Sequence, residues 1–251
     1  MEDDRTNLSS IKDVPDSIWQ NLSKKKIYFG HQSVGNNILD GVLDLMVVYP
    51  QIKLNIVETT DQADFSAGLF AHSRVGENQD PNSKIVSFAD NIKNGLGGTA
   101  DIVFFKFCYI DITPESDIEG IFAEYKYTLS ELKTTYPETQ FLHFTVPIKV
   151  VQTGPRAWVK KIIDHPIGGF AGNIKRNQFN EMLRTEYMGK EPVFDLTMIE
   201  STYSDGTRNV FKADDKRYYS LIPEYSHDGR HLNETGREKA AEQLLIFLAS
   251  L

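Results

Sequence analysis

The feature that most restricts the fold of this chain is a repeated alternation between short β-rich runs and longer amphipathic stretches. The β-rich runs hold β-branched or aromatic residues and predict strands at 26–30, 52–58, 101–107, 140–147 and 193–197. Apolar residues at helical spacing predict helices at 34–48, 118–135, 173–187 and 234–251. Such alternation is typical of a parallel sheet with both faces covered. We therefore expect an α/β fold, a flavodoxin-like three-layer α/β/α sandwich around a mainly parallel five-stranded sheet.

The length of 251 residues fits one such domain, because α/β folds often reach ~200–250 residues. We expect a tail and a short helix over 1–23 and a single α/β domain over 24–251. Long stretches at 65–87 and 149–172 depart from the alternation and are expected to wall a pocket, since long loops are often functional. A third, 200–227, is rich in tyrosine, and its rings either stack on a sugar or pack under the loop.

Composition excludes several classes of protein. A net charge of −8 argues against a nucleic-acid partner, because binding to phosphates needs clustered positive charge. No segment reaches the ~20 apolar residues of a membrane span. The first residues lack the basic and apolar regions of a signal peptide, although a chain whose leader has been removed would start in the same way. Cys108 is the single cysteine, which rules out an internal disulfide, and its apolar neighbours predict a buried thiol.

A serine stands where the first predicted strand turns into the first long helix. The strand stops at Gly30, and the helical pattern begins just after Ser33, in the string Gly30-His31-Gln32-Ser33. A side chain there faces the crevice at the carboxyl ends of the strands. Its backbone N–H lies at a helix N-terminus, where negative charge is favoured. Ser33 is therefore a candidate nucleophile that also supplies an oxyanion donor.

An acid and a histidine stand three residues apart before the last helix, in Asp228-Gly229-Arg230-His231. A serine hydroxyl needs a general base within hydrogen-bond reach, and the base needs a partner that fixes its tautomer. His231 fits the role of the base and Asp228 that of its partner. The alternative is that Asp228 caps the last helix and His231 is a surface residue.

Together these two blocks resemble the SGNH hydrolases, also called the GDSL-like esterases and lipases. The last block of that family, Asp-Gly-x-His-x-Asn-x-x-Gly, matches at Asp228, Gly229, His231, Asn233 and Gly236. The first block differs from the family's Phe-Gly-Asp-Ser, because it is one residue longer and has no aspartate, so the resemblance is to a divergent branch. The resemblance implies the SGNH fold, a catalytic triad of Ser33, His231 and Asp228, and activity on esters.

The resemblance also implies an oxyanion hole. Relatives use the serine N–H, a glycine N–H after the second strand and an asparagine after the third. Gly76 is the candidate glycine, with an ordinary turn as the alternative. Where the family has Gly-x-Asn-Asp this chain has only Ile110-Asp111, so either Asn78 substitutes from the neighbouring loop or the hole has two donors.

Four further residues are candidates for contacts in this region. His31 orients substrate or is structural, Gln32 donates an amide hydrogen, and Lys106 and Asp111 form either a buried ion pair or substrate contacts. No cofactor and no metal is expected. His227 and His231 have metal-ligand spacing, but Gly229 lies between them and the zincin glutamate is absent.

The sequence thus predicts a serine-dependent hydrolase that removes an O-acyl group from a carbohydrate or another small ester. One alternative is a non-catalytic, carbohydrate-binding or accessory protein on the same fold, which the missing asparagine favours and the intact Asp228–His231 block opposes. The other is an O-acyltransferase, which uses the same triad and leaves the same sequence pattern.

Overall fold

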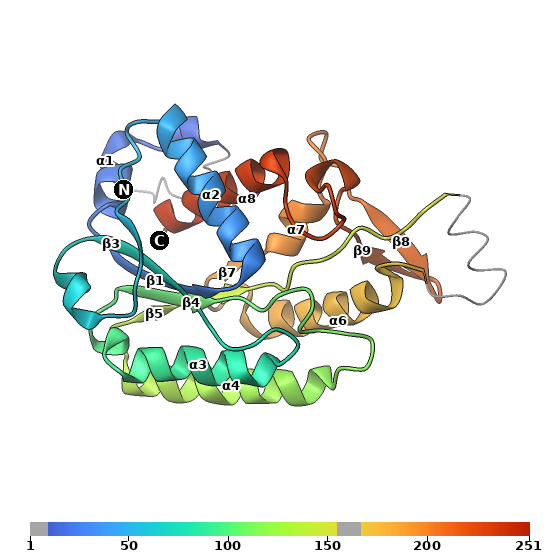
Figure 1. Cartoon of the computed structure of the whole chain (residues 1–251), viewed down its shortest axis with the longest axis horizontal. Helices are drawn as coiled ribbons and strands as arrows, with labels where there is room; N and C mark the ends of the chain where they lie inside the picture. The colour runs from blue at the N-terminus through green and yellow to red at the C-terminus, as the bar shows by residue number, and fades with distance from the viewer. Residues whose placement is uncertain (1–9, 155–166) are drawn as a thin grey trace.

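The computed structural model describes residues 10–154 and 167–251. Its centre is a parallel sheet with the strand order β2-β3-β1-β4-β5, which confirms the predicted α/β class (Figure 1). The strands are β1 (Lys26–His31), β2 (Ile56–Glu58), β3 (Leu69–Arg74), β4 (Ile102–Phe105) and β5 (Gln140–Phe141). A short parallel pair, β6 (His143–Phe144) with β7 (Val193–Phe194), follows β5, and β8 (Val210–Ala213) and β9 (Lys216–Tyr219) form an antiparallel hairpin.

Helices cover both faces of the sheet, as expected for a three-layer sandwich (Figure 1). One face carries α1 (Asp16–Leu22), α2 (Ser33–Val48), α7 (Leu196–Ser201) and α8 (Glu234–Ala249), and the other carries α3 (Pro81–Lys93), α4 (Ile118–Thr135) and α6 (Phe170–Tyr187). Successive strand residues point to opposite faces. Phe29 and Phe104 therefore enter the core under α2 and α8, whereas Tyr28 and Phe105 enter the core under α3 and α4.

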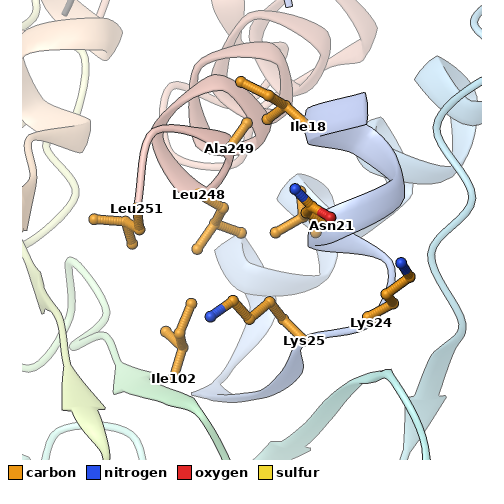
Figure 2. Close-up of a pocket in the computed structure, with 9 residues that line it drawn as sticks. Ile18, Asn21, Lys24, Lys25, Ile102, Leu248, Ala249 and Leu251 are labelled. Atoms are coloured by element: carbon orange, nitrogen blue, oxygen red, sulfur yellow. The ribbon is translucent and has the colours of Figure 1, made fainter. Parts of the chain in front are cut away.

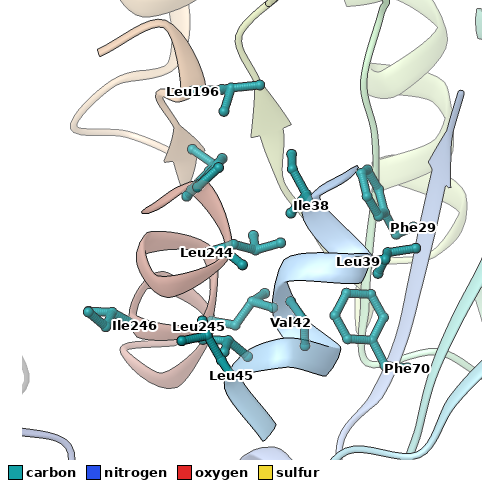
Figure 3. Packing of buried hydrophobic residues seen from close by; sticks show 14 of the residues in the cluster. Phe29, Ile38, Leu39, Val42, Leu45, Phe70, Leu196, Leu244, Leu245 and Ile246 are labelled. Atoms are coloured by element: carbon teal, nitrogen blue, oxygen red, sulfur yellow. The ribbon is translucent and has the colours of Figure 1, made fainter. Parts of the chain in front are cut away.

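The packing of α2 against α8 decides where the candidate residues lie. In Figure 3, Leu244 and Leu245 of α8 face the apolar side of α2, where Val42 is fully buried. The helices approach closely at Gly41, where a Cβ atom would lie 2.5 Å from the carbonyl oxygen of Arg237. Each buried leucine contributes about 1.5–3 kcal/mol relative to an exposed one. Ser33 begins α2 and α8 begins three residues after His231, so this packing brings two distant parts of the chain together.

The structure corrects the prediction of a loop at 65–87. Residues 69–74 form β3, which lies between β1 and β2, and α3 starts at Pro81 with Asp80 as its N-cap. The glycines and the proline mark only the ends of these elements.

The fifth strand of the sheet is therefore β3 and not 193–197, where only Val193–Phe194 is extended and pairs with β6. The predicted strands at 52–58 and 140–147 are also shorter or divided, and the 200–227 stretch contains the β8–β9 hairpin.

Residues 10–23 pack on the domain. Trp19 and Leu22 of α1 are buried in the same core as α8. Residues 1–9 of the predicted tail lie outside the described residues, and the division at residue 23 stays a prediction. Among the helices of the described ranges, none has both the length and the apolar character that a membrane crossing requires.

Candidate active site

Ser33 lies at the topological switch point of the sheet, where the chain changes the side on which it adds strands. Its strand, β1, has β3 on one side and β4 on the other, and the chain builds the first side before it crosses to the second. Ligands of doubly wound folds bind outside the carboxyl ends of the strands at such a point. Ser33 is the first residue of α2, and Gln32 before it is extended. The first N–H groups of a helix have no intrahelical acceptor, so the Ser33 N–H is a donor that favours negative charge.

His231 and Asp228 lie in the turn before α8, and they meet Ser33. The distance from His231 Nε2 to Ser33 Oγ is 3.2 Å, and that from His231 Nδ1 to Asp228 Oδ2 is 2.7 Å. Because an ionised carboxylate only accepts, Nδ1 carries the proton and Nε2 faces the serine as an acceptor. The structure therefore brings the three predicted residues into one hydrogen-bonded series.

The rest of the block between Asp228 and Gly236 builds this turn. Gly229 has a φ of +74°, which favours glycine. Asn233 caps α8, accepting from the Gly236 N–H at 3.0 Å, and also donates to the carbonyl of Glu224. A Cβ atom at Gly236 would lie 2.5 Å from the carbonyl oxygen of Tyr225. Each matched residue of the block outside the His–Asp pair thus has a structural role.

The surroundings of Asp228 keep it ionised. Its partial burial works to raise the pKa, but hydrogen bonds from the backbone and side chain of His231, and from the Arg230 N–H, hold the pKa well below its usual range. The anion can therefore orient the imidazole and stabilise its protonated form. The side chains of His231 and Asp228 are 37% and 39% exposed, so solvent reaches both.

Gly76 lies in the loop after β3, beside the Ser33 turn. The Val75 N–H donates to the His31 carbonyl at 3.2 Å, and the Gln32 side-chain amide donates to the carbonyls of Val75 and Gly76. Gln32 therefore ties this loop to the serine turn, which corrects the prediction that its amide donates to substrate. Gly76 has a φ of +52°, and a Cβ atom there would lie 2.5 Å from the backbone nitrogen of Lys84. Only glycine fits this position without rearrangement.

Asn78 follows in the same loop and is held by a buried ion pair. Lys84 Nζ donates to Asn78 Oδ1 at 3.0 Å and to Asp111 Oδ2 at 2.6 Å, and the ion-paired side chains are 0% exposed. Asp111 also accepts from the N–H groups of Gln79 and Cys108. Because an ammonium group only donates, it fixes the Asn78 oxygen inward and leaves the Asn78 Nδ2 as a donor.

Lys84 was missed in the sequence, where it fell in the predicted loop. Lys84, Phe88 and Ile92 follow at intervals of four residues, which places the lysine on the apolar face of α3. A lysine at such a position needs a buried acidic partner. This spacing was the sequence signal that could have predicted a buried, ion-paired lysine at position 84.

His31, Lys106 and Asp111 are buried, which favours the structural alternative for each of them over contact with substrate. His31 donates from Nδ1 to the Gln32 carbonyl, so its Nε2 accepts from His72 Nδ1 at 3.0 Å. Burial lowers the pKa of His31 to about 3, so the ring is neutral. Lys106 is 0% exposed and donates to the Phe107 carbonyl. The partner of Asp111 is Lys84 and not Lys106, so these residues support the loops around the site.

Two sizeable hollows in the described part of the chain lie away from Ser33. A cavity of about 570 Å³ lies between α1 and the end of α8, lined by residues that include Lys25, Ile102 and Leu248 (Figure 2). It is at the amino ends of the strands, opposite the Ser33 end. A groove of about 720 Å³ lies between α4 and α6.

Of the predicted wall at 149–172, residues 155–166 lie outside the described residues. Within the described ranges, no three His, Cys, Asp or Glu side chains gather as a metal-ligand set.

Comparison with known proteins identifies the fold. No protein-family model matches the chain, and no curated protein matches it. Among solved structures, a GDSL-like lipase from Bacteroides thetaiotaomicron has a TM-score of 0.51 at 13% identity, over 88% of this chain and 87% of the other.

A family 3 carbohydrate esterase from Clostridium thermocellum has a TM-score of 0.43 at 16% identity, over 88% of this chain and 92% of the other. The periplasmic domain of a lipopolysaccharide acetyltransferase from Salmonella ser. Paratyphi A has a TM-score of 0.46 at 8% identity, over 88% and 83%. Of these three structures, the Bacteroides lipase alone has a TM-score above 0.5. The resemblance seen in the terminal block is thus confirmed for the architecture, and the chain has the fold of the GDSL-like, or SGNH, hydrolases.

Proposed function

We propose that this protein is a serine-dependent ester hydrolase that uses Ser33, His231 and Asp228. The observation that carries the proposal is the continuous hydrogen-bonded series from Ser33 Oγ through the His231 ring to Asp228. Its serine–histidine distance of 3.2 Å is at the long end of hydrogen-bond reach. Asp228 also accepts from backbone N–H groups of its own turn, so the contact that speaks most directly for catalysis is the one between His231 Nε2 and Ser33 Oγ.

The geometry supports a two-step reaction. Ser33 Oγ attacks the carbonyl carbon of the ester while its proton passes to His231 Nε2, and Asp228 stabilises the imidazolium that forms. The tetrahedral intermediate collapses as the imidazolium gives that proton to the leaving alcohol. Water then attacks the acyl-enzyme with His231 again as the base, which releases the acid and restores Ser33. The exposure of His231 lets water act as this second nucleophile.

The oxyanion of the tetrahedral intermediate needs preorganised donors. We assign the Ser33 N–H, the Gly76 N–H and the Asn78 Nδ2 to this role. Two contacts support the assignment: Gln32 holds the Gly76 loop against the serine turn, and Lys84 orients the Asn78 amide. Asn78 would then replace the asparagine that relatives supply after their third strand.

The tyrosines of 200–227 mostly contact protein groups, which favours packing over sugar stacking. Tyr218 stacks on Phe211, the Tyr219 ring lies 3.9 Å from the Arg208 guanidinium, and the Tyr225 hydroxyl donates to the Thr202 carbonyl. The proposal therefore rests on the reacting groups. O-acylated carbohydrates remain among the small esters to be tested as substrates.

Labelling with a fluorophosphonate tests the proposed activity. We expect the wild-type protein to react at one residue, with the modification mapped by mass spectrometry to Ser33, and to hydrolyse 4-nitrophenyl acetate. An activated serine is required for both reactions. A folded protein that neither labels nor hydrolyses a panel of short esters would contradict the proposal and favour a binding or accessory role.

Replacement of Asn78 tests the third oxyanion donor. We expect Asn78→Ala to lower kcat by about 10²-fold with little change in KM, because such a donor acts mainly in the transition state. The measurement is steady-state hydrolysis of 4-nitrophenyl acetate. Asn82→Ala is the matched control, since Asn82 is an exposed asparagine on α3. Equal activity of the two variants would show that Asn78 is not a donor and that the oxyanion hole has only two donors.

A further inference from the structure

Lys149 occupies a rigidly built position beside the candidate site. Its N–H donates to Asn173 Oδ1 at 2.9 Å, and its carbonyl accepts from Asn173 Nδ2 at 2.6 Å and from the Leu221 N–H at 3.2 Å. The next residue, Val150, donates its N–H to the carbonyl of Gly229, in the turn between Asp228 and His231. The backbone of Lys149 is thus fixed against the turn that carries the candidate base.

The side chain of Lys149 lies over a ring that contacts His231. The ammonium nitrogen is 5.6 Å from the centre of the Tyr109 ring. The Tyr109 and His231 rings meet edge to face, with 5.6 Å between their centres. The backbone of Tyr109 is fixed by a hydrogen bond, because Arg176 Nε donates to its carbonyl at 2.6 Å. An ammonium group, an aromatic ring and the imidazole therefore follow one another at this side of Ser33.

Within the part of the chain that the structure describes, Lys149 has no close counter-ion. Among the described residues, no carboxylate oxygen lies within ion-pair distance of its ammonium group. Partial burial, followed by the positive charges of Arg176 and Arg230, lowers the pKa of Lys149, and only Asp228 opposes this. Asp228 is already engaged by His231 and by Arg230, whose Nε lies 3.5 Å away. Among the described residues, the charges that act on Lys149 are therefore two cations, Arg176 and Arg230, and one anion, Asp228.

We propose that Lys149 forms a subsite for an anionic group of the substrate, such as a carboxylate, phosphate or sulfate next to the ester. The inference rests on the proposed ester hydrolysis and names its substrate class. The ammonium group of Lys149 has no close counter-ion among the described residues. An anion on the substrate compensates this charge, and at short range in a partly buried site the attraction is substantial. Anionic esters should therefore be preferred over neutral ones.

Two matched pairs of esters test the preference for charge. 4-Acetoxybenzoate and its methyl ester place the charge on the alcohol side, whereas 4-nitrophenyl hemisuccinate and its methyl ester place it on the acyl side. The readout is the ratio of kcat/KM for the anionic ester to that for the neutral ester. Differences in intrinsic reactivity cancel when this ratio is compared between protein variants.

We expect Lys149→Met to lower the ratio roughly tenfold for one of the two pairs, as for loss of a single partly exposed charge contact. Lys149→Arg should retain most of the ratio, and Lys53→Met, which removes an exposed lysine between α2 and β2, should not change it. Added salt should lower the wild-type ratio more than that of Lys149→Met. Equal ratios in wild type and Lys149→Met for both pairs would overturn the proposal.

A second measurement does not need activity. Acetylation of Lys149 by an N-hydroxysuccinimide ester, followed by mass spectrometry, should slow severalfold with 4-hydroxybenzoate or succinate and not with the neutral 4-hydroxybenzamide. If no ester is hydrolysed but this protection is seen, the proposed hydrolysis fails and the anion subsite stands. Absence of protection, together with unchanged ratios where hydrolysis occurs, rejects the subsite alone.

Discussion

Ser33→Ala is expected to lower the kcat for 4-nitrophenyl acetate by roughly 10⁴-fold or more and to abolish fluorophosphonate labelling. The hydroxyl is the only proposed nucleophile, and the remaining donors and binding groups sustain a small residual rate. His231→Ala should cause a similar loss, and the double variant should be little worse than either single one, because the residues act as a unit.

Ser130→Ala is the matched control, since it removes an exposed hydroxyl from α4. All variants should keep the wild-type circular dichroism and unfolding midpoint to within a small shift. Retention by Ser33→Ala of more than a tenth of the wild-type rate would show that the esterase activity arises elsewhere.

Lys84→Met is expected to lower the free energy of unfolding by about 3–5 kcal/mol, the range for removal of one partner of a buried ion pair. Asp111 would keep its two backbone donors but would remain as a buried, uncompensated anion. The double variant Lys84→Met/Asp111→Asn removes this charge and should recover part of the loss. Urea denaturation of the single and double variants measures both effects.

A second lysine ion pair provides the control for this prediction. Lys126 pairs with Glu186 at 2.9 Å, but the two side chains are 41% and 38% exposed. Lys126→Met should therefore cost less than about 1 kcal/mol. If Lys84→Met is no more harmful than Lys126→Met, the Lys84–Asp111 pair does not hold the loop that carries Gly76 and Asn78.

The sequence predicted those parts of the fold whose signals are local. The helix expected at 118–135 has the observed bounds, and the helix expected at 34–48 begins one residue later than observed. Ser33, Asp228 and His231 were found because a strand-to-helix turn and a short motif each lie within a few consecutive residues. Their meeting in space was expected from the resemblance, which implied that the three residues form one triad.

The missed elements have mixed local signals. The second half of β3 is His72-Ser73-Arg74, which is polar because the strand approaches the site, and α3 starts with an Asp-Pro pair that is also common in turns. The roles of Gln32 and Asp111 depend on partners distant in sequence: the Gly76 loop for Gln32 and Lys84 for Asp111. The same is true of Lys149, whose backbone is fixed by Asn173 and Leu221. No pattern within one segment reveals such contacts.

The contact between α2 and α8 sets an order of events during synthesis. Ser33 and His231 are 198 residues apart, so the ribosome makes the serine roughly 10–40 s before its histidine at ~5–20 residues per second. During that interval the apolar side of α2 has no α8 to cover it, which exposes a surface prone to aggregation. If the proposed triad is correct, we expect a nascent chain that holds Ser33 and the Gly76 loop but not His231 to be inert toward esters. The apolar side of α2 becomes buried only when the last helix packs against it.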